Sequence, residues 1–325
     1  MKDTRYYQDQ KEYAQLSWRK DKKKALNLQG GCVSLRLVAV VCLLLNPGNI
    51  FAGDGTFSFF AVQFKVTPQI YSSEDAFLAA VQPFFYEAKE VGADIIIFPE
   101  YTSALLAAMP LVKKIPPQFY DQNLELPQIL DLAGTPDGIS VPLYLKNQAS
   151  SVKETMDQVW GSLAVRFKIT AVAGTYFALD NGELKNRLVV YSPDGRIRYQ
   201  QDKVYLTPFE RNLLSLSPGN IEEVDHILID GKVLGFTICR DTFFESWNRI
   251  HADADMWIDL KANGADYDQD QKKIFQRALP ERLAETGVEY GLTLCLTGNF
   301  FSLFWEGISR FDRGGGDSAA ILKKA

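Results

Sequence analysis

Apolar runs alternate with amphipathic stretches from Phe57 onward, and this pattern predicts strands and helices in turn. The run Phe57–Val66 is typical of a core strand. The run Asp94–Phe98 is apolar almost throughout, which predicts a strand buried on both faces. Between them, apolar residues recur at helical spacing over residues 74–91. A strand, a helix and a second strand form the start of an α/β unit.

The hydrophobic pattern predicts further helices and strands as far as the end of the chain. Residues 110–148 are rich in loop residues and are expected to hold a helix or two, and an aromatic-rich loop is expected after residue 296. No internal repeat or low-complexity linker interrupts residues 57–325, so we predict a single domain there. Further helices are expected over 151–167, 244–252 and 270–287, and further strands over 169–177, 188–192, 197–201, 227–229, 232–238, 256–260, 290–296 and 318–322.

The first 52 residues differ from this pattern. A basic, polar tail precedes the apolar run LVAVVCLLL at 37–45, and Asn46-Pro47-Gly48 ends the run. A run of about nine residues is too short to cross a bilayer, which takes roughly 20. A basic flank, a short apolar core and a small residue at Ala52 have the layout of a signal peptide. We therefore interpret 1–52 as a basic tail plus a signal-like or anchor segment.

This interpretation carries a prediction of location. The protein would be exported, to a periplasmic or extracellular space, or attached to a membrane through residues 37–45. The alternative is that the run is a strand or helix of the fold, in which case the protein would be cytoplasmic.

Composition is ordinary for a globular protein, with 46% hydrophobic and 23% charged residues. The net charge of −5 gives no support to a nucleic-acid-binding role. Four cysteines and two histidines, His226 and His251, are too few and wrongly spaced for a zinc site. The sequence does not decide whether Cys239 and Cys295 form a disulfide.

Three polar residues share one setting, the end of an apolar run. Glu100 follows DIIIF, Lys203 follows a predicted hairpin strand, and Cys239 follows GFTI. Each has an ordinary alternative: a solvated acid, a surface lysine, and a buried thiol acting as a small hydrophobe. Together a base, a cation and a nucleophile at strand ends fit covalent hydrolysis, because a thiol needs a base and a nearby positive charge to react.

Three segments resemble the signatures of the nitrilase, or carbon–nitrogen hydrolase, superfamily, and of its amidase-like branch in particular. ADIIIFPEYTS is similar to the glutamate motif, QDKVYLTPFE to the lysine motif and GFTICRDTFFESW to the cysteine motif. They occur in the family's order and at its spacing, and the resemblance runs from about Phe57 to Leu322.

The resemblance implies a single-domain α/β fold, the four-layer α-β-β-α sandwich. It implies that Glu100 is the general base, Cys239 the nucleophile that forms a thioester, and Lys203 the residue that stabilises the oxyanion with the backbone N–H of Arg240. Glu210 stands where many members have a second, substrate-positioning glutamate. Arg240 and Tyr101 are weaker candidates for substrate contact. No metal or organic cofactor is implied, and homo-oligomers are usual.

The implied function is hydrolysis of a non-peptide C–N bond in a small-molecule amide or N-carbamoyl substrate, with release of ammonia or an amine. Alternatives are a nitrilase acting on a C≡N bond, an N-acyltransferase, and a catalytically impaired interaction protein with the same fold. Two departures from the family pattern bear on this choice. The segment MWIDLKANG at 256–264 lacks the usual proline, and the C-terminus is short, which suggests truncation of domain 57–325.

Overall fold

The computed structural model describes residues 38–42, 57–135, 139–314 and 320–321. The chain divides into a unit of residues 1–36, which lies outside the described residues, and a unit of residues 37–325.

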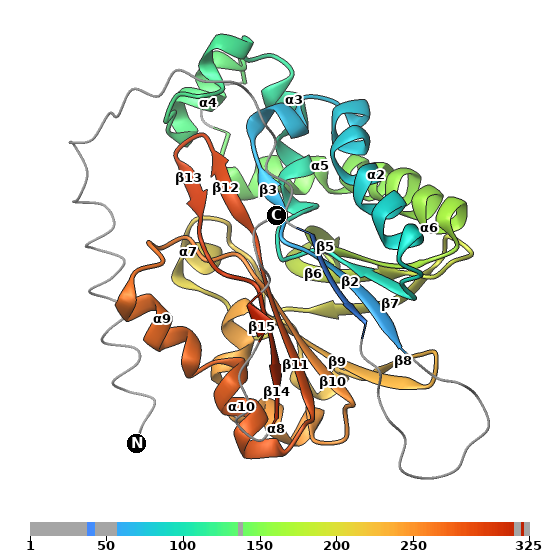
Figure 1. Ribbon diagram of the computed structural model, residues 1–325. Coiled ribbons are helices and arrows are strands. Elements are labelled where there is room, and N and C mark those ends of the chain that lie inside the picture. The colour runs from blue at the N-terminus through green and yellow to red at the C-terminus, as the bar shows by residue number, and fades with distance from the viewer. Residues whose placement is uncertain (1–37, 43–56, 136–138, 315–319, 322–325) are drawn as a thin grey trace. The chain divides into compact units, whose positions relative to one another are not determined.

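One sheet has the strand order β1-β2-β4-β5-β6-β7. Its strands β2, β5, β6 and β7 are labelled in Figure 1. Strands β2, β4 and β5 run parallel, whereas β6 is antiparallel to both β5 and β7. The carboxyl ends of β4 and β7 therefore lie at the same edge. The strands are β1 (Val38–Cys42), β2 (Ser58–Val62), β4 (Ile95–Ile97), β5 (Thr170–Asp180), β6 (Glu183–Tyr191) and β7 (Ile197–Asp202).

A second sheet has the order β15-β14-β11-β10-β9-β8. Its middle strands β9, β10 and β11 are parallel, so their carboxyl ends also share an edge. The strands are β8 (Ile227–Ile229), β9 (Lys232–Ile238), β10 (Met256–Lys261), β11 (Tyr290–Cys295), β14 (Arg310–Arg313) and β15 (Ala320–Ile321).

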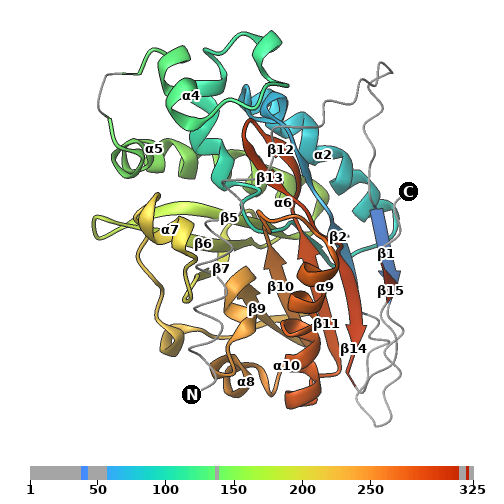
Figure 2. The same ribbon diagram turned by 90° about the vertical axis from the view of Figure 1, so that its left-hand side faces the viewer.

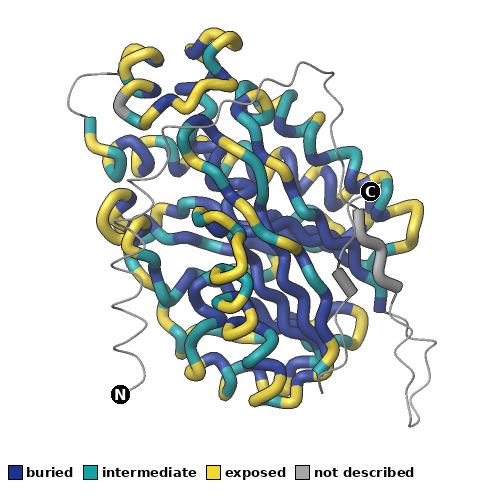
Figure 3. The backbone as a smooth tube through the Cα atoms, turned by 60° about the vertical axis from the view of Figure 1, so that its left-hand side comes forward, coloured by how far each residue is buried: buried dark blue, intermediate teal, exposed yellow. Residues whose placement is uncertain are grey.

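The two sheets pack face to face, and helices cover their outer faces (Figure 2). Apolar side chains of both sheets, such as Ile97 and Phe236, form the core between them, and Figure 3 shows these strands as buried. Helices α2 (Glu74–Glu90), α5 (Val141–Met156) and α6 (Ser162–Phe167) pack on the first sheet. Helices α8 (Ser246–His251) and α10 (Leu279–Thr286) pack on the second. The predicted four-layer α-β-β-α sandwich is confirmed.

The remaining elements are short. They are β3 (Lys65–Val66), β12 (Thr297–Phe300) and β13 (Leu303–Trp305), the 3₁₀ turns η1 (Pro68–Tyr71), η2 (Ala104–Ala108), η3 (Pro117–Phe119), η5 (Ile221–Glu223) and η6 (Cys239–Phe243), the π-helical turn η4 (Asp157–Gly161), and helices α3 (Met109–Val112), α4 (Leu126–Leu132), α7 (Pro208–Asn212) and α9 (Gln269–Gln276).

Three predicted elements are corrected. The run Phe57–Val66 is two strands, because β3 leaves the first sheet and pairs with β12. The helix predicted over 270–287 is two, because Ala278 is non-helical and Pro280, which lacks an N–H, starts a new helix in its first turn. The aromatic segment after residue 296 is the hairpin β12–β13 rather than a loop, because its backbone groups pair with one another.

The apolar run 37–45 is described only over Val38–Cys42, which forms β1 and pairs antiparallel with β2. Over these residues, the structure agrees with the alternative interpretation, in which the apolar run is a strand of the fold. No helix among the described residues is long and apolar enough to span a bilayer. Export or anchoring through the first 52 residues stays a prediction.

Candidate active site

Glu100 is positioned by the turn that follows β4. The next residue, Tyr101, has a left-handed backbone with φ 62°, and its N–H donates to Thr175 Oγ1 at 3.0 Å. The turn packs closely against a bulge in β5 that contains Gly174. A Cβ atom on Gly174 would lie only 2.2 Å from the carbonyl oxygen of Pro99. Glycine is required there, and the turn holds the Glu100 carboxylate inside the protein with 1% exposure.

Lys203 follows β7 and reaches the same point from a different strand. Its Nζ donates to Glu100 Oε1 at 2.8 Å and to Glu210 Oε1 at 3.0 Å, and all three side chains are buried. Thr207 caps α7 in a reciprocal box: its Oγ1 accepts from the Glu210 N–H, and its own N–H donates to Glu210 Oε2 at 2.7 Å. This cap turns the Glu210 carboxylate inward.

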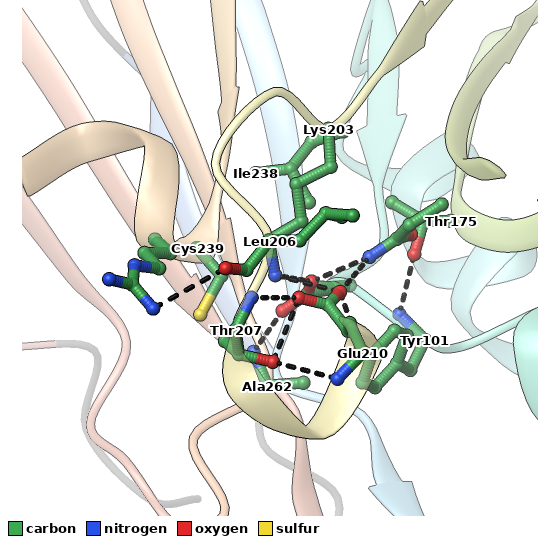
Figure 4. A network of polar contacts seen from close by, with 12 residues as sticks. Tyr101, Thr175, Lys203, Leu206, Thr207, Glu210, Ile238, Cys239 and Ala262 are labelled. Carbon is green, nitrogen blue, oxygen red and sulfur yellow. Dashed lines mark hydrogen bonds and ion pairs between the residues drawn. The ribbon is translucent and has the colours of Figure 1, made fainter. Parts of the chain in front are cut away.

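Three further donors complete the cluster. Asn186, on β6, donates through Nδ2 to Glu100 Oε1 at 2.9 Å and to Glu210 Oε1 at 2.8 Å. The Tyr101 hydroxyl donates to Glu210 Oε1 at 2.7 Å. From the second sheet, the N–H of Ala262 donates to Glu100 Oε2 at 2.9 Å. Figure 4 shows this network joining segments of both sheets.

The two carboxyl groups differ in acidity although they share partners. Burial raises the pKa of Glu100; the Lys203 ammonium opposes this and the Glu210 carboxylate adds to it. Burial acts on Glu210 in the same direction, but the Lys203 charge and the donors on Thr207 and Tyr101 outweigh it and leave the Glu210 pKa below its ordinary value. Both carboxylates hold the pKa of Lys203 well above its usual range, although burial opposes them. Lys203 is therefore a fixed positive charge.

Cys239 lies at the end of β9, where the chain turns into η6. Its backbone is left-handed, with φ 54°, and the residue is partly exposed. Burial of the sulfur raises the pKa of the Cys239 thiol to about 12; the charge of Glu100 acts in the same direction, while Lys203 and Lys261 oppose it. The resting group is a thiol rather than a thiolate.

Asp241 ties the cysteine turn to the lysine segment. Its carboxylate accepts from the backbone N–H of Tyr205 at 2.7 Å, of Val204 at 3.2 Å and of Ile238 at 3.4 Å. Burial raises the Asp241 pKa to about 7 against these hydrogen bonds. Both Lys203 and Cys239 thus sit on segments that one carboxylate holds together.

The structure places each residue that the sequence singled out. Glu100, Lys203 and Glu210 are in direct contact, with Tyr101 bonded to Glu210. The Arg240 side chain donates to the carbonyl oxygen of Leu206 at 3.3 Å, so it contacts the lysine segment. In the described part of the chain, Cys239 and Cys295 are both free thiols, which answers the question of a bridge between them.

Sequence reasoning missed two contributors. Asn186 alternates with Leu184 and Leu188 on β6, and an amide at an apolar position of that alternation was a readable signal. Lys261 ends the buried strand β10, which is the same signal that had singled out Glu100.

A model of the carbon–nitrogen hydrolase family matches residues 61–276, more than half of the 325-residue chain. A probable hydrolase, YhcX, of Bacillus subtilis (strain 168) is 26% identical over 186 residues, which cover 57% of this chain and 30% of that protein. The chain thus spans less than a third of that relative.

Solved structures show the fold. The amidase from Nesterenkonia sp. AN1, in a mutant form carrying acrylamide added at its active site cysteine, has a TM-score of 0.57 at 15% identity, covering 81% of this chain and 88% of that one. A carbon–nitrogen hydrolase from Helicobacter pylori G27 has a TM-score of 0.56 at 16% identity, covering 78% of this chain and 82% of that one.

Proposed function

The chain belongs to the carbon–nitrogen hydrolase, or nitrilase, family, and from this membership we propose that it hydrolyses a small amide or N-carbamoyl compound through a thioester on Cys239. The observation that carries the proposal is the buried cluster of Glu100, Lys203 and Glu210 beside a thiol on a left-handed turn. The amidases among similar structures support the choice of substrate class.

In the first half-reaction, Glu100 takes the proton of the Cys239 thiol as the sulfur attacks the carbonyl carbon. Because the thiol pKa is high, the proton moves during attack rather than before it. Collapse of the tetrahedral intermediate expels the amine, which takes the proton back from Glu100, and a thioester remains. The raised pKa of Glu100 suits a group that accepts a proton and returns it.

In the second half-reaction, Glu100 takes a proton from water as the water oxygen attacks the thioester. The carboxylic acid product leaves, and the proton returns to the Cys239 sulfur. Atoms and charge balance without any external reagent.

Lys203 is suited to stabilise the oxyanion in both halves. An ammonium has three N–H donors, and Glu100 and Glu210 take two of them. We assign the third, with the backbone N–H of Arg240, to the developing negative oxygen. Glu210 accepts from Lys203, and Asn186 holds the Glu100 and Glu210 carboxylates in place, so the two residues aim that donor.

The test is a screen for ammonia or amine release over amides, N-carbamoyl compounds and nitriles, with Cys239→Ala and Glu100→Gln as variants. We expect release from amides or N-carbamoyl compounds and at least a thousandfold loss in both variants. Release that survives in Cys239→Ala would defeat the mechanism. Release from nitriles alone would identify a nitrilase.

A second assay separates an enzyme from an impaired interaction protein. We expect iodoacetamide to label Cys239 far faster than the fully buried Cys295 in the native protein. Equally slow labelling of both cysteines, with no turnover in the screen, would favour the interaction protein.

A further inference from the structure

A second lysine lies beside the cysteine turn. Lys261 ends β10, and its Nζ donates to the carbonyl oxygen of Cys239 at 3.0 Å. The same Nζ lies 2.8 Å from the Asp259 carboxylate. The exposures of the two side chains are 1% and 0%. Neither residue takes part in the proton transfers described above.

Strand geometry explains the pairing. Asp259 and Lys261 are two residues apart on β10, so their side chains point to the same face. That face also carries Trp257, which packs on the helices of the outer layer. There the rings of Phe243 and Phe275 lie 4.8 Å and 5.1 Å from the Lys261 Nζ.

A buried ion pair is weak support for stability. Desolvation of both charges offsets most of their attraction, and apolar residues of the same size are often as stable. The sequence nevertheless places this pair at a strand end, and the following N–H, that of Ala262, bonds to Glu100. The position points to a role in the site rather than in the core.

Lys261 contacts the backbone carbonyl oxygen of Cys239, which belongs to the peptide that joins Cys239 to Arg240. The Cys239 oxygen accepts from Lys261 Nζ and from Thr242 Oγ1 at 3.1 Å. A non-glycine residue is strained in the left-handed region, so such a turn needs contacts that hold it. The same peptide unit carries the N–H of Arg240, and a cation on a carbonyl oxygen strengthens the N–H of that unit as a donor.

We propose that Lys261, with Asp259 as its counter-ion, is a positioning residue that holds the Cys239–Arg240 peptide and supplies a second positive charge to the thiol. The proposal rests on the proposed function, in which that peptide N–H faces the oxyanion.

The charges of Lys261 and Asp259 have opposite effects on the pKa of the Cys239 thiol. The Lys261 charge lowers the pKa of the Cys239 thiol, and the Asp259 charge raises it. Asp259 in turn raises the pKa of Lys261, against burial, so the ammonium form is kept. Removing either residue breaks the same ion pair, yet the thiol should respond in opposite directions.

The experiment measures alkylation of Cys239 by iodoacetamide from pH 7 to 11, read on the Cys239 peptide by mass spectrometry. We expect Lys261→Met to slow alkylation at pH 8 by about tenfold and Asp259→Asn to accelerate it about threefold, through the thiolate fraction. A purely structural role would move both variants in the same direction. That result, or unchanged profiles in folded variants, would overturn the proposal.

Two further comparisons keep the test decisive. Lys273→Met and Asp270→Asn remove a solvent-exposed pair of the same kind on α9, and they should leave the profile unchanged. Should Lys261→Met fail to fold, Asp259→Asn is compared with the double variant Asp259→Asn/Lys261→Met. This comparison differs only in the lysine, and the double variant leaves no unpaired buried charge.

Turnover separates this proposal from the function on which it rests. In an active enzyme, Lys261→Met should lower kcat at least tenfold with little change in KM, because no contact with substrate is lost. Alkylation needs no substrate. A negative substrate screen with opposite shifts in the two variants would reject the function alone, and normal turnover with unshifted profiles would reject the role of Lys261 alone.

Discussion

Two carboxyl groups with shared partners acquire different acidities in this cluster. Lys203 and Asn186 bond to both Glu100 and Glu210. Of the remaining donors that the structure describes, Glu100 has only the N–H of Ala262, whereas Glu210 has both Thr207 and Tyr101. The N–H of Thr207 and the hydroxyl of Tyr101 keep Glu210 ionised, and Glu100 is left as the group that can carry a proton. When two neighbouring acidic groups have different pKa values, the difference often shows which of them transfers protons during catalysis.

Tyr101→Phe tests this division. Loss of a hydrogen bond to a charged group costs about 1.5–3 kcal/mol, so we expect hydrolysis to slow by at least tenfold. Because the lost donor favoured the ionised form, the pKa of Glu210 should rise, and the acid limb of the pH–rate profile should move to higher pH.

The matched control is Tyr71→Phe. The buried Tyr71 hydroxyl donates to the carbonyl oxygen of Thr102 at 2.8 Å, next to the same turn but not to a carboxylate. We expect lower stability with an unchanged pH profile. The same shift in both variants would contradict a specific role for Tyr101.

At the scale of elements, the site depends on how strands end. The β4 turn presses on the β5 bulge, the β7 segment leads into a capped short helix, and β9 ends in a left-handed turn. Each junction places one polar side chain at the carboxyl end of a strand. These junctions, rather than the strands themselves, set the geometry of the cluster.

Gly174→Ala should disturb one such junction, and Gly182→Ala is its control. Both glycines are left-handed, at φ 68° and 81°, so each alanine costs roughly 1–2 kcal/mol of strain. Only at Gly174 would the Cβ meet another atom, the Pro99 oxygen, and we expect a further loss of about 2 kcal/mol or more there. Urea unfolding measures both.

Activity adds a second reading. Gly182→Ala should keep full hydrolysis, whereas Gly174→Ala should lower it, because the turn that carries Glu100 must move. Equal unfolding midpoints for the two variants would argue against a close contact between the β5 bulge and Pro99.

At the scale of the molecule, the hydrophobic pattern predicted the order of most helices and strands, whereas the four layers were implied by the resemblance to the nitrilase superfamily. Buried runs such as Ile95–Ile97 are unambiguous, because a strand covered on both faces has no polar positions. The pattern could not predict where β3 leaves its sheet or which strands become neighbours. Pairing depends on contacts distant in sequence, which no local run of residues encodes.

The site was predictable to a similar depth. Glu100, Lys203 and Cys239 share a strand-end position that a reader of the sequence can see. Asn186 and Lys261 also stand in buried runs of the sequence, but their partners come from distant segments that only folding brings near, so the sequence did not reveal what they contact. The roles of all these residues in catalysis stay predictions.

Acid sensitivity of the whole fold is expected from His251. Its ring lies between Trp247 and Trp257 and bonds to His226 and to the carbonyl oxygen of Phe236. Burial lowers the His251 pKa from 6.5 to about 3. A depressed pKa gives stability that is present above pH 6.5 and is lost as pH falls toward 3, by up to about 4 kcal/mol.

His251→Phe isolates this contribution. Asp241, with its pKa raised to about 7, works in the opposite direction, because its protonation stabilises the fold as pH falls. The variant should therefore be less stable at pH 7 but lose less free energy of unfolding between pH 6.5 and 4, as measured by urea titration. An identical decline in variant and parent would exclude His251 as a cause.

The contacts of Glu100 also determine when the site can exist. Its partners Lys203 and Ala262 lie 103 and 162 residues farther along the chain. During synthesis, therefore, the segment bearing Glu100 emerges long before either partner is made. Contacts of such long range are slow to form, because a long loop must close first. The cluster can therefore assemble only after the chain has been made as far as Ala262, and until then the Cys239 thiol lacks the neighbours that it has in the folded protein.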